Sequence, residues 1–503
     1  MRILLILTLT LAYHFVSSQT LTKEHIKRLV NQHFDESLIT LKDFLEIPNN
    51  GKDSVQVNNN VAWCTNQFES LGFQTTILYA QGVKHLFAER KAQKKTNQTV
   101  LFYLQIDGQP VDTSRWNQRN PFDPVLKKCD ACEEIDWSGI KDWKDDWRIY
   151  ARSASDSKGP ATSFIEALKI LKEQKIEPPY NIKVLMDFQE EQGSPTLPQL
   201  VQDNKLLLTS DAMLIMDGTR PPNNLPTLMF GARGISTLKI TVFGAYKDLH
   251  SGQYGNFAPN PAFDLARLLA SMKDENGKVL IPGFYEGVNL TDGLKKEINE
   301  VPENKEEMLS KLGLYQAEKI GDTYQEALQY PTLNIRGMQA GWINDQVRTI
   351  IPATATAELD MRLVPETPAE RQIELVRKFI ESKGFHIIDS LPTAKERATY
   401  PHLLQLSYRL GSKPFRTDLN SEFGQQLSDA MNRTLGKGNY IRMQSTGGSQ
   451  PIAPFVITLG IPAISIRIAN PDNNIHAPNE NLSLGNFEEG IRMCIGILTQ
   501  KLE

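Results

Sequence analysis

The chain has 503 residues and carries 55 Lys and Arg against 59 Asp and Glu, which leaves a formal net charge of −4. This near balance gives no basic surface of the kind that nucleic-acid-binding proteins use, so it excludes that class of partner. The content of 40% hydrophobic and 23% charged residues is typical of a globular chain. Because a hydrophobic core stops growing at about 250–300 residues, the length predicts two domains.

The first residues have the pattern of a secretory signal peptide. Met1-Arg2 is followed by an apolar run over residues 3–12 and by the small residues Ser17 and Ser18. The run is too short to cross a bilayer, so it is not read as an anchor. The sequence therefore predicts an exported protein, secreted or periplasmic, with a signal peptide over residues 1–18 and no membrane anchor.

From residue 21 onward, helical and strand patterns alternate. Apolar residues recur at helical spacing over residues 21–47 and 58–71, and Gly159-Pro160 opens a third helix. Compact apolar runs that predict buried strands lie at residues 100–106, 182–188 and 212–216. This alternation is typical of an α/β layer with a largely parallel sheet.

Residues 116–147 interrupt the alternation with four Trp, many acidic residues and the pair Cys129 and Cys132. We interpret this segment as an insertion over the sheet, with the Trp as packing anchors. Half a zinc site would need a second ligand pair nearby, and a redox motif would need a strand before it. A local disulfide is the interpretation that suits an exported protein.

A different pattern occupies the middle of the chain. Strands that alternate apolar and polar residues are expected at 236–243 and 354–363, each followed by a helix, at 260–272 and 368–383. After about residue 410 the first pattern resumes, with a helix at 422–435. Strands are then expected at 454–459 and 463–468.

The expected fold class is α/β, in which a mixed, largely parallel sheet forms one domain and an α+β, ferredoxin-like domain is inserted into it. The first domain would comprise residues 19–230 and 411–503, and the inserted domain residues 231–410.

Polar residues gather where the predicted strands of the first domain end. They follow a strand, precede a helix or lie in a loop after a strand, and they are Asp107, Asp156, Glu190, Glu191, Asp217 and His476. The carboxyl ends of the strands are where open α/β sheets place their sites. Taken singly, such residues are more often helix caps or solvated carboxylates.

Several carboxylates that face one another repel unless cations neutralise them. Two divalent metal ions about 3.5–4 Å apart would do so, with one carboxylate bridging them. One further carboxylate must stay unligated to act as a general base. The adjacent Glu190 and Glu191 can divide these two tasks.

Six motifs resemble, in order, those of the carnosinase-like dipeptidases, which belong to the aminoacylase–carboxypeptidase family of di-metal hydrolases. The motifs are Asp156-Ser-Lys-Gly159-Pro160, Gln189-Glu190-Glu191-Gln192-Gly193-Ser194, Asp248-Leu-His250-Ser-Gly252, Met361-Arg362-Leu-Val-Pro365, Gly447-Gly448-Ser449 and Asn474-Ile-His476-Ala-Pro-Asn-Glu480. The resemblance runs from about residue 60 to the end of the chain. It implies a metallopeptidase that cleaves dipeptides or short peptides with a free carboxylate.

The resemblance also implies roles for the polar residues. Asp156 would bridge two metal ions, Asp217 would complete the first metal site, and Glu191 and His476 would complete the second. The implied cofactor is zinc, one or two ions, with manganese or cobalt as alternatives. Glu190 would be the general base.

Further residues follow from the same resemblance. Asp107 would orient a ligand of the first metal from behind. Arg362, Thr349, Ser449 and Gly448 would hold the substrate, and the planar fork of Arg suits a carboxylate. The inserted domain would be a lid through which the chain forms a homodimer, and His250 would reach the partner's active site.

One position departs from the family pattern. The first-metal ligand is a His two residues before Asp107, and this chain has Gln105 there. Gln offers a neutral amide oxygen, which suits hard ions better than zinc.

Three outcomes follow from Gln105: a weak but filled first site, a slower hydrolase with only the second site filled, or a binding protein on an enzyme fold. We expect a working hydrolase, because Glu190, Asp156 and the substrate-binding residues are all present. An aminoacylase that acts on N-acyl amino acids is an alternative.

Overall fold

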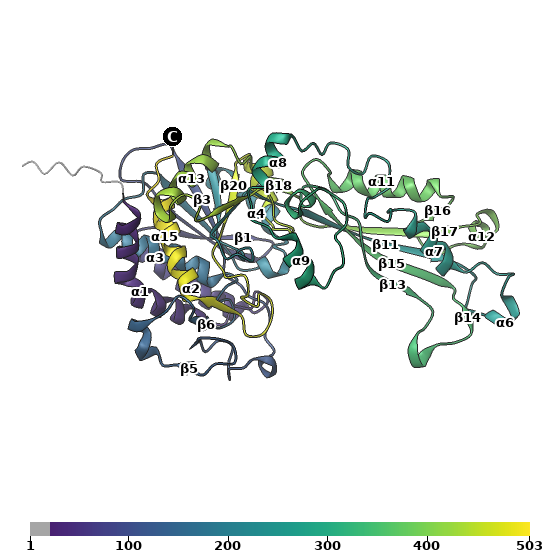
Figure 1. The fold of residues 1–503 in the computed structure, drawn as a ribbon, viewed down its shortest axis with the longest axis horizontal. Coiled ribbons are helices and arrows are strands. Elements are labelled where there is room, and N and C mark those ends of the chain that lie inside the picture. Colours follow the sequence, from purple (N-terminus) through teal and green to yellow (C-terminus); the bar gives the residue numbers. More distant parts are fainter. Residues whose placement is uncertain (1–20, 503) are drawn as a thin grey trace, which may run out of the picture.

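The computed structural model describes residues 21–502 and shows an elongated molecule with a sheet in each half (Figure 1). The signal peptide expected over residues 1–18 lies outside the described residues. In the described part of the chain, no helix is both long enough and apolar enough to cross a membrane.

The half of the molecule that holds both ends of the described chain is built on an eight-stranded sheet. In spatial order its strands are β1 (Gln74–Ala80), β2 (Val83–Arg90), β7 (Asn181–Asp187), β3 (Thr99–Gln105), β8 (Ala212–Ile215), β20 (Ala463–Arg467), β9 (Thr227–Met229) and β19 (Ile441–Met443). The central strands β7, β3, β8 and β20 are parallel, whereas β1, β2 and β9 introduce antiparallel pairs. The expected mixed, largely parallel sheet is therefore confirmed.

Helices cover both faces of this sheet because its central strands are apolar on both sides. On β3, Phe102 and Leu104 pack into one core, and Leu101 and Tyr103 pack into the other. The helices of the first core are α1 (Lys23–Leu45), α2 (Ser54–Ser70), α3 (Lys158–Glu173), α13 (Glu422–Leu435) and α15 (Leu484–Leu498). Those of the second core are α4 (Leu197–Asp203), α5 (Lys205–Leu208) and α14 (Ala453–Leu459).

One predicted element is wrong. The apolar run at residues 454–459 was expected to be a strand, but it forms helix α14 (Ala453–Leu459). A short apolar run fits a buried helix as well as a strand, and Pro454 lies in the first turn, where helices tolerate proline. Phe455 of this helix packs on Tyr103, with the ring centroids 5.4 Å apart.

The segment predicted as an insertion contributes to a small separate sheet. Its strands are β21 (Asn481–Ser483), β6 (Arg148–Tyr150), β4 (Val125–Lys127) and β5 (Glu134–Ile135). The segment also holds η2 (Trp137–Asp142), and η1 (Thr113–Arg115) lies just before it. Trp137, Trp143 and Trp147 pack against the first core as anchors, and a disulfide joins Cys129 to Cys132.

The other half of the molecule contains a five-stranded sheet. In spatial order its strands are β13 (Asn334–Ala340), β15 (Thr354–Leu363), β11 (Gly234–Phe243), β17 (Leu403–Leu410) and β16 (His386–Ile388). Alternate residues of β11 and β15 form one core with α7 (Pro261–Ala270) and α11 (Ala369–Ser382). All seven residues of the edge strand β13 are exposed. This α+β sheet matches the expected inserted fold.

The chain enters and leaves this half side by side, because β10 (Gly231–Ala232) pairs with β18 (Phe415–Arg416). The shorter elements between these points are β12 (Leu249–His250), α6 (Ser251–Tyr254), α8 (Asp292–Ile298), α9 (Lys305–Leu312), α10 (Tyr324–Ala327), η4 (Asn344–Gln346), β14 (Ile350–Ile351) and α12 (Ala394–Thr399). In Figure 1, α6 and β14 lie at the end of the molecule far from α1.

Candidate active site

Three predicted metal ligands meet at one point beside the eight-stranded sheet. The Nε2 atom of His476 lies 2.9 Å from Oδ2 of Asp156 and 3.2 Å from Oε2 of Glu191. One ligand atom of each residue lies within 4.8 Å of the other two. Among residues 21–502, no other set of three His, Cys, Asp or Glu side chains is arranged this closely.

A buried carboxylate positions Asp156 within this group. Oε1 of Glu480 accepts hydrogen bonds from the backbone N–H of Ser155 and of Asp156, at 3.0 and 2.9 Å. Its other oxygen pairs with Nη1 of Arg152 at 2.7 Å. Glu480 stands in the same sequence motif as His476, but sequence reasoning assigned it no role. The buried pairing partner Arg152 carried no sequence signal.

The remaining predicted carboxylate, Asp217, lies next to Asp156 without joining the group of three. The Ser157 hydroxyl reaches both acids, at 2.9 Å from Oδ1 of Asp156 and 2.7 Å from Oδ1 of Asp217. Oδ2 of Asp217 accepts a hydrogen bond from Nε2 of Gln450 at 3.2 Å. Both oxygens of Asp217 therefore already have donors from the protein.

Asp107 holds the turn that carries the two glutamates, η3 (Glu190–Gln192). Its Oδ1 accepts a hydrogen bond from the backbone N–H of Glu190 at 2.9 Å, and its Oδ2 accepts one from Glu191 at 3.2 Å. Nε2 of Gln109 donates to Oε2 of Glu191 at 2.7 Å. In this chain Asp107 thus orients the glutamates rather than a histidine.

The site has more negative charge than its surroundings balance. Burial raises the pKa of Glu190 well above its usual value, and the nearby Asp217 and Asp156 raise it further. Burial and the charge of Asp156 raise the pKa of Glu191 to about 8. The hydrogen bond to Asp156 raises the pKa of His476 to about 9. Burial and the neighbouring carboxylates thus concentrate poorly solvated negative charge at one point, and such a site is suited to a divalent cation.

The expected second metal position fits an ion, since Asp156, Glu191 and His476 offer two carboxylates and an imidazole at one point. The expected first position does not fit in the same way. Gln105 replaces the imidazole, and both polar atoms of its buried side chain lack a hydrogen-bond partner among residues 21–502. The two positions are therefore unequal.

Two predicted substrate-binding residues meet where the two halves of the molecule contact each other. Nη1 of Arg362, at the end of β15, lies 3.4 Å from Oγ of Ser449. Gly448 is the exposed neighbour of Ser449. Arg362 comes from the five-stranded half and Ser449 from the other half, so this pair joins the two.

His250 and Thr349 lie elsewhere. Both are exposed, and the backbone N–H of Ser251 donates to the Thr349 carbonyl at 3.0 Å, which places the two residues side by side. They flank α6 and β14 at the far end of the molecule (Figure 1). Within one chain, the structure does not bring them to the carboxylates.

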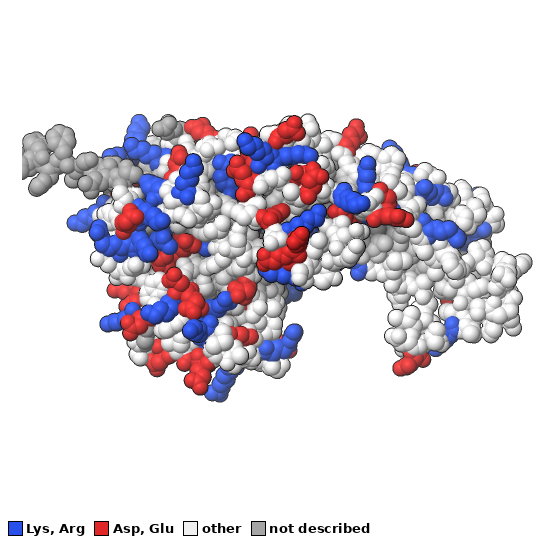
Figure 2. Space-filling model, viewed as in Figure 1, with Lys and Arg blue, Asp and Glu red and all other residues white. Residues whose placement is uncertain are grey.

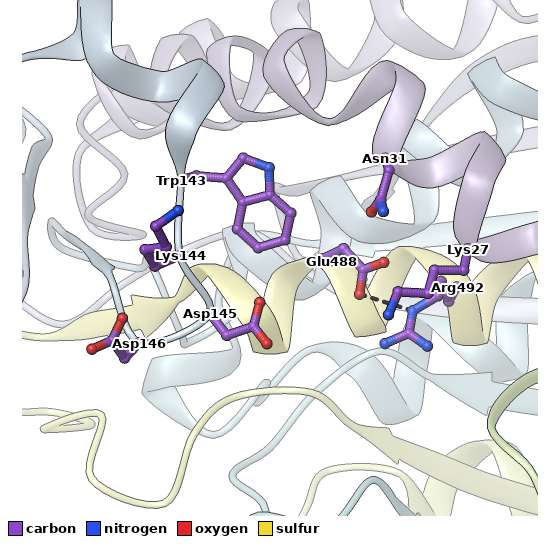
Figure 3. Close-up of a pocket in the computed structure, with 8 residues that line it drawn as sticks. All are labelled: Lys27, Asn31, Trp143, Lys144, Asp145, Asp146, Glu488 and Arg492. Carbon is purple, nitrogen blue, oxygen red and sulfur yellow. Dashed lines mark hydrogen bonds and ion pairs between the residues drawn. The ribbon is translucent and has the colours of Figure 1, made fainter.

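A separate surface pocket lies between α1, residues 143–146 and α15 (Figure 3). It is lined by Lys27, Asn31, Trp143, Lys144, Asp145, Asp146, Glu488 and Arg492. Its Arg492 is paired with Glu488 at 2.8 Å. The pocket contains no set of ligands close enough to hold a metal ion, so it is not the candidate site.

Comparison with known proteins identifies a family that the sequence matches. Residues 101–500 match the model of peptidase family M20/M25/M40. The chain is 27% identical over 410 residues to the Cys-Gly metallodipeptidase dug1 of Schizosaccharomyces pombe, which covers 79% of each chain. It is 24% identical over 495 residues to the Beta-Ala-His dipeptidase of Homo sapiens, which covers 93% of this chain and 91% of the human one.

Solved structures agree on the fold. An M20 family metallo-carboxypeptidase, Sso-CP2 from Sulfolobus solfataricus, is 28% identical with a TM-score of 0.73, covering 92% of this chain and 98% of the other. The di-peptidase Dug1p of Saccharomyces cerevisiae is 22% identical with a TM-score of 0.68, covering 94% of this chain and 97% of the other. Both likenesses extend over the two halves of the molecule.

The predicted location is corrected. Export to a secreted or periplasmic compartment was expected from residues 1–18, but Dug1-type relatives, such as those of the two yeasts, are cytosolic enzymes. The prediction of an exported protein is therefore wrong. It rested on the short apolar run at residues 3–12 and the small residues that follow it.

Proposed function

The chain belongs to peptidase family M20/M25/M40, and from this membership we propose that it is a metal-dependent dipeptidase. It would hydrolyse the amide bond of dipeptides or short peptides that carry a free carboxylate. The observation that carries the proposal is the group formed by Asp156, Glu191 and His476, with Glu190 adjacent to Glu191 and not part of the group. Two relatives named above are dipeptidases, for Cys-Gly and for Beta-Ala-His.

The residues of the group would hold a metal ion, for which we propose zinc, with manganese or cobalt as alternatives. When bound, such an ion supplies positive charge that polarises the scissile carbonyl. Glu480 and Arg152 keep Asp156 in place, and Gln109 keeps Glu191 in place. The ligands are thus held before an ion arrives.

Glu190 is proposed as the general base. Its carboxyl is half-buried, and poor solvation together with the charges of Asp217 and Asp156 raises its pKa well above the usual value, which makes it a stronger acceptor for a proton. Asp107 fixes its backbone through the hydrogen bond to the Glu190 N–H. Glu190 would accept a proton from the attacking water and pass it to the leaving amine.

Arg362, with Ser449 and Gly448, is proposed to bind the free carboxylate of the substrate. The guanidinium matches a carboxylate in shape and charge, and Ser449 adds a hydroxyl donor at its side. Because Arg362 belongs to one half of the molecule and Ser449 to the other, substrate binding would hold the halves together.

We further propose that residues 19–230 and 411–503 form the catalytic domain and that residues 231–410 form a lid and dimerisation domain. The pairing of β10 with β18 supports these boundaries, since the chain crosses between the halves there. His250 and Thr349 lie too far along the lid to act within their own chain, so we propose that they serve the partner's site.

The far end of the lid has a surface suited to a homodimer. Figure 2 shows few charged side chains there compared with the opposite end. Large apolar side chains are exposed on it, namely Tyr254, Phe257, Trp342, Ile343 and Val347. Light scattering tests this part: a dimer is expected, and a stable monomer would contradict a role for His250 in a partner's site.

Turnover of a substrate panel tests the proposed function. Purified protein would be given dipeptides and N-acyl amino acids in the presence of zinc, manganese or cobalt. Hydrolysis of dipeptides with at least one metal is expected. Hydrolysis confined to N-acyl amino acids would indicate an aminoacylase, and no turnover with any metal would indicate a binding protein.

A further inference from the structure

We propose that the guanidinium of Arg467 takes the place of the first metal ion, so that each chain binds one divalent ion, at Asp156, Glu191 and His476. This inference deepens the proposed function, on which it rests, because it names the composition of the same metal centre. It starts from a row of side chains that crosses the sheet.

The row runs over five adjacent strands on the face covered by α4 and α14. In the register of β3 with β7, Gln105 stands opposite Asp187. The register of β3 with β8, continued two residues beyond Tyr103↔Ile215, places Asp217 beside Gln105. At the end of the row, Nδ1 of His85 lies 3.5 Å from Oδ1 of Asp187.

Arg467 completes the row on the other side of Asp217. The register of β8 with β20 includes Ser465↔Ile215, and the bridge Thr219↔Ala469 continues it with the same offset. Residue 467 therefore stands directly opposite residue 217. Arg467 is thus the residue of β20 that stands next to Asp217 in the row, on the side away from Gln105.

The surroundings of Arg467 show that its charge serves this site. The side chain is only 7% exposed, and two of its nitrogens, Nε and Nη2, have no hydrogen-bond partner in the described chain. The charges that act on it are those of Asp217 and Asp156. In the described part of the chain no ion pair joins Arg467 to a carboxylate within 4.0 Å, so it acts on both acids through its charge and not as a paired ion.

A glycine makes room for this cation. Residue 218 has φ of 108°, which favours glycine, and a methyl group built on it would lie 1.4 Å from Nη1 of Arg467. Any other residue at position 218 would displace the guanidinium. Gly218 and Arg467 therefore form a matched pair next to Asp217.

Three features then oppose an ion at the first position. A dication would be repelled by the buried charge of Arg467, and repulsion is strong where water is excluded. Both oxygens of Asp217 already accept hydrogen bonds, from Ser157 and Gln450. Gln105 supplies only a neutral oxygen. The second position is spared, because Oδ2 of Asp156 faces His476 while Oδ1 faces Ser157.

Metal content measured by mass spectrometry after dialysis against zinc tests this inference without depending on activity. The wild-type chain is expected to hold one ion. Q105H is also expected to hold one, because Arg467 remains. The double variant Q105H/R467Q, which restores the imidazole and removes the charge, is expected to hold two.

The double variant Q105H/R467K is the matched control, because it keeps a positive charge and should hold one ion. Circular dichroism would establish that each variant is folded. Two ions in the wild-type chain, or in Q105H/R467K, would overturn the inference, as would one ion in folded Q105H/R467Q. If Q105H/R467Q fails to fold, the wild-type count decides.

The inference and the proposed function can fail separately. One ion per wild-type chain with no turnover of any peptide would remove the proposed function and leave the inference standing. Two ions per wild-type chain with peptide turnover would overturn the inference and leave the proposed function standing. No ion at all would overturn both.

Discussion

Asp156 and Asp217 share a hydrogen-bond donor, Ser157, yet their surroundings differ in a way that decides what each can do. Around Asp156, an imidazole nitrogen and a second carboxylate oxygen lie within 4.8 Å of its own oxygen and of each other. Around Asp217, the neighbours are an amide and a guanidinium. Of two neighbouring carboxylates, one can thus favour a metal ion and the other oppose it. The difference comes from the charges of the side chains around each carboxylate.

The largest effect is expected at the Asp156 side, from His476→Ala. Removing the imidazole leaves two carboxylates without the third ligand, so the bound ion and peptide hydrolysis should both fall to background. Mass spectrometry of the protein and a dipeptide assay measure these two quantities. His386→Ala, in the lid, is the control and should change neither. Retention of the ion in His476→Ala would place the metal elsewhere.

The second-largest effect is expected from Glu190→Gln. This variant separates metal binding from the catalytic step. It should lower kcat about 10²–10⁴-fold, which is the usual contribution of a general base. Metal content should stay at the wild-type value, because Glu190 is not one of the three ligands. Glu300→Gln, at an exposed position, is the control. Full turnover in Glu190→Gln would remove it from its role.

Glu480→Gln tests how the Asp156 side is held in place. It breaks a fully buried ion pair with Arg152 and leaves that cation uncompensated, which usually costs about 3–5 kcal/mol of unfolding free energy. Chemical denaturation measures this loss. Metal affinity should weaken as well, because Glu480 anchors the backbone of Asp156. Unchanged stability would show that water replaces the pair.

Asp217→Asn is expected to have the smallest effect on metal binding. If the Asp217 side holds no ion, the variant should keep the wild-type metal content, since none of the three ligands changes. Isothermal titration calorimetry with zinc measures the number of metal sites and their affinity. Loss of one ion relative to the wild-type chain would show that Asp217 ligates a metal.

The two sides also differ in how far the sequence predicts them. Asp156, Glu191 and His476 each lie in a recognisable motif, so their order along the chain was enough to group them. Arg467 ends an apolar run that reads simply as a buried strand. Its position beside Asp217 depends on the register between strands 250 residues apart, which no local pattern contains.

Other elements also divide into those that local sequence patterns predict and those that depend on packing. The strands and most helices of the first half follow from apolar periodicity, whereas the run at 454–459 became a helix because short apolar runs fit both forms. Glu480 was visible in a motif, but its burial and its hydrogen bonds to residues 153–156 come only from packing. The place of His250 likewise depends on the length of the lid.

Anomalous scattering at the zinc edge, from crystals grown with zinc, tests the central claim most directly because it locates each ion. One peak per chain is predicted, between His476, Glu191 and Asp156. A second peak of comparable height between Gln105 and Asp217 would contradict the substitution of a metal ion by Arg467.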